Sequence, residues 1–167
     1  MNQFINNIPN LNGKNLMKKI IKYILLTFFF LNSMGLNAMT QDEMEKIVIK
    51  NVKVIEHEKG TILFTYQKVK MMLISDKNHD RMRIITPIRE YSLLTEKVKE
   101  TIMEANFHSA LDARYALRDG VIYSAFIHPL SPLSKAEIES ALKQVATLAQ
   151  TFGSTYSSTE LNFQGTK

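Results

Sequence analysis

TILFTYQKVKMMLISDKNHDRMRIIT, residues 61–86, contains three strand-like runs separated only by short polar turns. The first run is β-branched and aromatic, the second is almost continuously apolar, and the third follows the polar turn at residues 76–80. Because connections this short force neighbouring strands to be antiparallel, the stretch predicts a three-stranded meander. Pro87 is expected to end it, since proline cannot donate a hydrogen bond to a strand ladder.

Helix and hairpin signals flank this meander. We expect helices at residues 41–52 and 92–106, strands at 113–117 and 121–127 around an Asp-Gly turn, and a last helix after Ser134. Ser134 and Glu137 form a capping box at the start of that helix, and Gly153 marks its end. The order α-β-β-β-α-β-β-α predicts an α+β fold, with a five-stranded antiparallel sheet and helices packed on one face. Residues 52–57 fit either the end of the first helix or a short strand.

The first 38 residues have the pattern of a secretory signal peptide. Four lysines precede an apolar run at residues 23–31, and a polar stretch with Gly35 leads to the small residue Ala38. The run is shorter than the roughly 20 apolar residues that a membrane-spanning helix needs, which favours cleavage after Ala38 over a permanent anchor. The true start is either Met1 or Met17, and either would export the chain. We therefore expect a periplasmic or extracellular protein that meets the membrane only during export.

The remaining chain is expected to form a single domain at residues 39–153 and a polar tail at residues 154–167. The chain has no cysteine, so disulfides and thiol chemistry are excluded. The net charge of +5 belongs mainly to the signal, because its four lysines leave 17 basic and 16 acidic residues in the rest of the chain. Arg81, Arg83 and Arg89 lie among acidic residues, so the sequence does not predict binding to nucleic acid.

Catalytic signatures are absent from the sequence. It has no nucleophile elbow and no phosphate-binding glycine loop, and its four histidines do not have metal-ligand spacing. The expectation is a protein without catalytic residues, cofactor or metal ion. An alternative stays open, namely a small periplasmic ligand-binding protein or hydrolase with a polar site at one end of the sheet, near His108, Arg114 and His128.

The strands carry more apolar residues than one packed face requires. Alternation separates Met72 and Ile74 from their neighbours, and it divides the last strand into two faces that both carry apolar residues. If helices cover one face only, the other keeps an apolar surface that could bind a peptide or a second copy of the chain. The residues expected on that surface are Met72, Ile74, Ile122 and Phe126, and a one-residue shift in register would reverse their faces. A sheet buried on both faces is the alternative.

Three stretches resemble the YbjN domains, which share the fold of the type III secretion chaperones. They are residues 60–66 with the following strand and residues 80–84, residues 113–123, and residues 128–133 leading to 144–149. The resemblance covers roughly residues 44–152, and its matching positions are apolar and turn residues that carry over no active site. It implies a non-enzymatic module that binds peptides or unfolded segments, often as a dimer. Proteins of this family are often labelled sensory-transduction regulators.

The signal peptide departs from this pattern, because secretion chaperones work in the cytoplasm. The leading expectation is therefore an exported, chaperone-like module that binds a protein or peptide partner on a sheet face. A structural envelope protein that is simply a stable homodimer is a further alternative.

Overall fold

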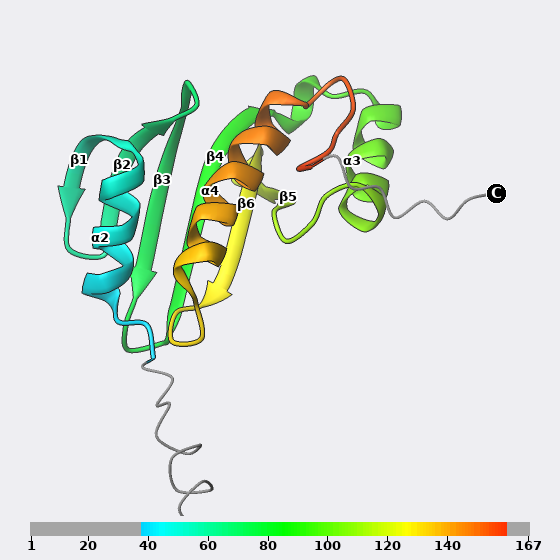
Figure 1. Ribbon diagram of the computed structural model, residues 1–167. Helices are drawn as coiled ribbons and strands as arrows, with labels where there is room; N and C mark the ends of the chain where they lie inside the picture. The colour runs from blue at the N-terminus through cyan, green and yellow to red at the C-terminus, as the bar shows by residue number, and fades with distance from the viewer. Residues whose placement is uncertain (1–37, 160–167) are drawn as a thin grey trace, which may run out of the picture. The chain divides into compact units, whose positions relative to one another are not determined.

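The structure is a computed structural model that describes residues 38–159 (Figure 1). In chain order the elements are α2 (Gln41–Asn51), β1 (Lys53–Glu58), β2 (Thr61–Tyr66), β3 (Val69–Asp76), β4 (Arg81–Glu90), the 3-10 helix η1 (Tyr91–Leu93), α3 (Glu96–His108), β5 (Arg114–Arg118), β6 (Val121–Pro129) and α4 (Lys135–Gln150). These residues belong to one compact unit that begins at Ala38. The predicted signal segment before Ala38 lies outside the described residues.

All six strands pair into one antiparallel sheet with the order β1-β2-β3-β4-β6-β5. The predicted meander is β2, β3 and β4, and the predicted hairpin is β5 and β6. The hairpin turns at Asp119 and Gly120, where both residues have positive φ (49° and 75°), as a tight hairpin turn requires. The predicted α+β fold is confirmed, with one strand more than expected.

Two helices cover one face of the sheet. Figure 1 shows α2 and α4 side by side in front of the strands. The side chains buried between them and the sheet include Met44, Val48, Ile62, Phe64, Leu73, Ile84, Phe126, Ile138, Leu142 and Val145. Both helices begin with a capping box, Thr40 with Glu43 and Ser134 with Glu137, the second as predicted. Within residues 38–159 the opposite face carries no helix, and no helix is long and apolar enough to cross a membrane.

The extra strand is β1. The predicted first helix ends at Asn51 rather than at residue 52, and the ambiguous residues that follow form a strand. All six residues of β1 are exposed, so apolar alternation could not mark it in the sequence. Its ladder with β2 is what holds it in the sheet.

The second helix begins later than predicted. Residues 91–93 form the short η1 instead, and α3 starts after Thr95, whose hydroxyl accepts a hydrogen bond from the N–H of Val98 (3.3 Å). Helix α3 lies at the β5 edge, where the side-chain amide of Asn106 bonds both the N–H and the C=O of Tyr115 (2.7 and 3.0 Å).

The segment after α4 is packed beyond the predicted domain end at Gly153. Ser158 is buried, and its hydroxyl accepts a hydrogen bond from the N–H of Leu111 (2.8 Å). The hydroxyl of Ser109 donates to the carbonyl of Tyr156 (2.8 Å). These bonds hold residues 154–159 against the connection between α3 and β5.

Candidate functional site

The uncovered face of the sheet carries a row of apolar side chains. The strand register places Leu63 of β2 opposite Met72 of β3, and Met72 opposite Ile85 of β4. These three side chains are half-buried, whereas their sequence neighbours point under the helices and are buried. The row therefore forms an apolar floor that a ligand could bury further.

Pro87 interrupts the ladder between β3 and β4. The paired register ends at Met72 and Ile85, and the next hydrogen-bonded pair would join Lys70 to Pro87. Proline has no N–H that could donate to the carbonyl of Lys70. The hydroxyl of Thr86 donates a hydrogen bond to this carbonyl instead (2.8 Å). Beyond this point β3 pairs only with β2, and β4 only with β6, so the two strands diverge (Figure 1).

A groove of about 820 Å³ lies along this break. Its apolar floor is formed by Leu63, Met72, Ile74, Ile85, Pro87 and Tyr123. Its far wall is the last turn of α4, where the side chain of Gln150 donates to the carbonyl of Gln67 in the β2–β3 turn (2.8 Å). The groove thus runs from the open sheet face into the gap that the missing ladder bond leaves.

The charged residues that line the groove are all cationic. Lys68 and Lys70 come from the β2–β3 turn and the start of β3, and Arg118 is the last residue of β5, just before the β5–β6 turn. Both turns lie at the end of the sheet where β3 and β4 diverge, since β4 pairs with the start of β6 there. The groove is therefore apolar along its floor and positively charged at one end.

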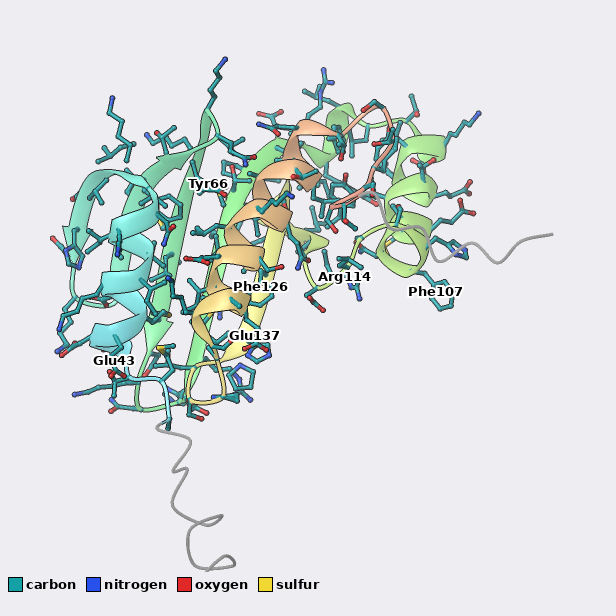
Figure 2. All side chains as sticks on the ribbon, in the orientation of Figure 1. Glu43, Tyr66, Phe107, Arg114, Phe126 and Glu137 are labelled. Atoms are coloured by element: carbon teal, nitrogen blue, oxygen red, sulfur yellow. The ribbon has the colours of Figure 1, made fainter. Side chains whose placement is uncertain are left out.

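Two of the four predicted surface residues, Met72 and Ile74, line the groove. The placement of Ile122 and Phe126 on the same face is wrong, because they are only 2% and 4% exposed and lie in the core under the helices. Figure 2 labels Phe126 beside α4. The register aligns Ile85 with Ala125, so the odd-numbered residues of β6 face the groove side. Both faces of β6 are apolar, which is why alternation alone could not choose between them.

Leu63, Ile85 and Tyr123 on the floor, and the three cations at its end, were not predicted from the sequence. One signal pointed to the groove. The sequence predicts that Pro87 ends a strand, but β4 continues through it to Glu90 by pairing with β6. A proline inside a strand requires an unpaired side, and that unpaired side is where the groove lies.

The alternative polar site near His108, Arg114 and His128 does not form in the structure. Arg114 donates to the carbonyl of Ala110 (2.7 Å), and His128 stacks on the ring of Phe126 (centroids 5.7 Å apart). The Nδ1 of His108 is buried without a hydrogen-bond partner among the described residues. The three side chains therefore interact with different neighbours and do not share a polar site. Within residues 38–159, no group of three or more histidine or acidic side chains is placed to hold a metal ion.

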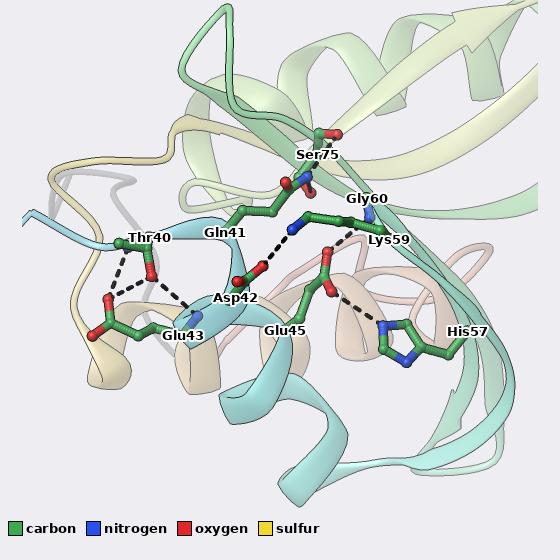
Figure 3. Close-up of polar contacts among 9 residues, drawn as sticks. All are labelled: Thr40, Gln41, Asp42, Glu43, Glu45, His57, Lys59, Gly60 and Ser75. Atoms are coloured by element: carbon green, nitrogen blue, oxygen red, sulfur yellow. Dashed lines mark hydrogen bonds and ion pairs between the residues drawn. The ribbon is translucent and has the colours of Figure 1, made fainter.

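A polar cluster ties the start of α2 to the β1–β2 hairpin (Figure 3). The carboxylate of Glu45, which is almost fully buried, accepts a hydrogen bond from the N–H of Gly60 (2.8 Å) and lies 3.1 Å from Nε2 of His57. The side chain of Gln41 donates to the hydroxyl of Ser75 (2.8 Å). These contacts fix the start of α2 on the β1–β2 hairpin and on β3.

Four carboxylates have a lowered pKa, and each owes it to a local structural motif. Hydrogen bonds from the backbone and hydroxyl of Thr40 lower the pKa of Glu43, and those from the hydroxyl and backbone of Ser134 lower the pKa of Glu137. In the β3–β4 turn, a hydrogen bond from the ring of His79 lowers the pKa of Asp76, and one from the hydroxyl of Ser131 lowers that of Asp80. None of the four lines the groove, and all serve helix caps or turns.

No protein-family model matches the chain, and no curated protein matches its sequence. A chain of the HopA1–SchA chaperone-effector complex is similar in structure, with a TM-score of 0.50 and 10% identity over 67% of this chain and 88% of that chain. A chain of the ExsC–ExsE complex has a TM-score of 0.45 and 14% identity, over 64% and 84%. The fold is chaperone-like. At these identities the likeness to the first complex shows the fold alone.

Proposed function

We propose that this protein is an exported, non-enzymatic module that binds extended segments of partner proteins in the groove beside Pro87. The observation that carries the proposal is an apolar groove of about 820 Å³ on a sheet face that no helix covers within residues 38–159. Covering its half-buried floor would stabilise a complex by about 25 cal/mol for each Å² of apolar surface removed from water.

The shape and the side chains of the groove favour a segment of polypeptide. The floor follows the strands, so an extended chain can lie along it and direct every second side chain downwards. Met72 lies in the middle of the floor, and a flexible methionine side chain adapts to different partners. The similar chain from the HopA1–SchA complex belongs to a chaperone-effector pair, which supports a protein ligand for this fold.

Export places the partner outside the cytoplasm. The basic start, the short apolar run and Ala38 support secretion to the periplasm or beyond. The resemblance to YbjN domains supports a binding role without catalysis. An exported copy would meet partners other than the substrates of a cytoplasmic secretion chaperone.

Site-specific crosslinking tests the proposal. Because the chain has no cysteine, Ile85→Cys can carry a photo-crosslinker on the groove floor, and Lys143→Cys, on the exposed side of α4, serves as the matched control. The full-length protein is mixed with short peptides that alternate apolar and uncharged polar residues. Adducts should form at position 85 and not at position 143.

Met72→Asp, which places a charge on the floor, should abolish the adducts at position 85. Ile88→Thr at the groove wall is a milder, uncharged variant that should reduce them if Met72→Asp fails to fold. Equal labelling at positions 85 and 143, or none at either, would contradict peptide binding in the groove. Adducts between copies of the protein alone would favour a structural dimer instead.

A further inference from the structure

We propose that the segment bound in the groove is acidic at one end. Its carboxylates would pair with Lys68, Lys70 and Arg118, while the apolar residues that follow lie on the floor towards Ile74. This inference rests on the proposed function and specifies the chemistry of its ligand. The three cations would make the groove bind acidic partner segments more tightly than neutral or basic segments of equal apolarity.

The charge of the groove is unbalanced. Within residues 38–159, Lys68 and Lys70 have no carboxylate at ion-pair distance, and no acidic residue lines the groove. Arg118 pairs through Nε with the exposed Asp119 (3.1 Å), which leaves its two terminal nitrogens for a ligand. Complementary charge on a ligand would speed its encounter with this end and fix its orientation.

The turn that carries Lys68 is strained and fixed. Gln67 and Lys68 are the two central residues of the β2–β3 turn, and both have positive φ (47° and 67°). Side-chain-bearing residues adopt this conformation at a cost in free energy, and Asn-Gly is the preferred pair in such turns. The turn is held by the hydrogen bond from Gln150 to the carbonyl of Gln67. The backbone of Lys68 is thus held in a fixed place beside the groove, so binding would order its exposed side chain but not the turn itself.

The ligand must join its acidic and apolar parts within a short distance. Along β3, Lys70 and Ile74 are separated by about 13 Å at the usual rise of a strand. A segment of about five extended residues therefore spans the floor from its cationic end to Ile74. Its acidic residues must directly adjoin its apolar ones.

Fluorescence anisotropy with the full-length protein tests this inference. The probes are three labelled short peptides with the same alternating apolar half and with a terminal block of glutamates, glutamines or lysines. We expect the glutamate peptide to bind roughly 10-fold more tightly than the glutamine peptide, and the lysine peptide to bind most weakly. Raising NaCl from about 0.05 M to about 0.5 M should remove the advantage of glutamate.

Replacing the three cations by glutamine (Lys68→Gln, Lys70→Gln and Arg118→Gln together) should make the three peptides bind alike. All three side chains are exposed, so the fold should persist, and Lys143→Gln is the matched control that keeps the preference.

Equal binding of all three peptides to the unchanged protein would overturn the acidic ligand and leave groove binding standing. Binding of none would overturn the proposed function itself. Cation-dependent binding to phosphatidylglycerol vesicles, without preference among the peptides, would overturn a peptide ligand in favour of an anionic lipid surface.

Discussion

Lys68 shows how a single residue can oppose stability and serve binding at once. Its φ of 67° lies in the left-handed region, which costs a side-chain-bearing residue about 1–2 kcal/mol relative to glycine. Glycine is the residue that a tight hairpin turn prefers at this position. A lysine here destabilises the isolated fold, and this is understandable if its charge is needed beside the groove.

Lys68→Gly should therefore raise the free energy of unfolding by about 1 kcal/mol, because it relieves the positive-φ strain. It should also weaken binding of the glutamate peptide, because it removes a cation. Lys68→Gln is the control that removes the charge and keeps the strain, so it should weaken binding without raising stability. Urea unfolding and anisotropy measure the two effects. Equal stability of the glycine and glutamine variants would show that the turn is not strained.

At the scale of the elements, the gap between β3 and β4 follows from one missing N–H. Pro87→Val supplies this N–H opposite the carbonyl of Lys70, so the ladder should extend by one pair and close part of the groove. We expect the free energy of unfolding to rise by about 1 kcal/mol and the affinity for peptides to fall. Amide hydrogen exchange should show a protected N–H at position 87.

Thr86 provides the control, because its hydroxyl now bonds the Lys70 carbonyl. Thr86→Val should destabilise the parent by about 1 kcal/mol, and destabilise the Pro87→Val variant less, since the new N–H then bonds that carbonyl. Additive effects of the two substitutions would mean that the ladder does not extend.

The capping box of α4 predicts a dependence of stability on pH. Hydrogen bonds from Ser134 lower the pKa of Glu137 below its ordinary value of 4.5. A carboxylate with a lowered pKa in the folded state stabilises the fold at a pH above its ordinary pKa, and this contribution is lost as the pH falls through the folded pKa.

Glu137→Gln can still accept the hydrogen bond from the Ser134 N–H but cannot titrate. Urea midpoints should therefore fall less steeply below about pH 4.5 in this variant. The same acid slope in both proteins would contradict the assignment.

At the scale of the whole molecule, the fold was more predictable than the site. Residues 61–86 determined the meander because their turns are too short for any other connection. The sequence left residues 52–57 open between a helix end and a short strand, because all residues of β1 are exposed and no burial pattern marks it. The groove depends on Pro87 lying opposite Lys70, where the ladder stops, and sequence alone does not show this because register is a tertiary property. Ile122 and Phe126 were misplaced for the same reason.

Export is the remaining proposal about the whole chain, and it can be tested directly. In the structure the N–H of Met39 donates to the carbonyl of Ser131 (2.9 Å) and Thr40 caps α2, so a cut after Ala38 would keep both contacts. When the full chain is expressed in a bacterium, N-terminal sequencing of the exported fraction should find Met39 first.

Ala38→Phe should block this cleavage, because the peptidase pocket before the cut accepts only a small residue. The expected result is an unprocessed precursor that stays with the membrane. Met39→Leu, which lies after the cut, should be processed like the parent. An uncleaved parent chain in the cytoplasm would contradict export. The partners of the groove would then be proteins inside the cell. The peptide measurements would still decide whether the groove prefers acidic segments.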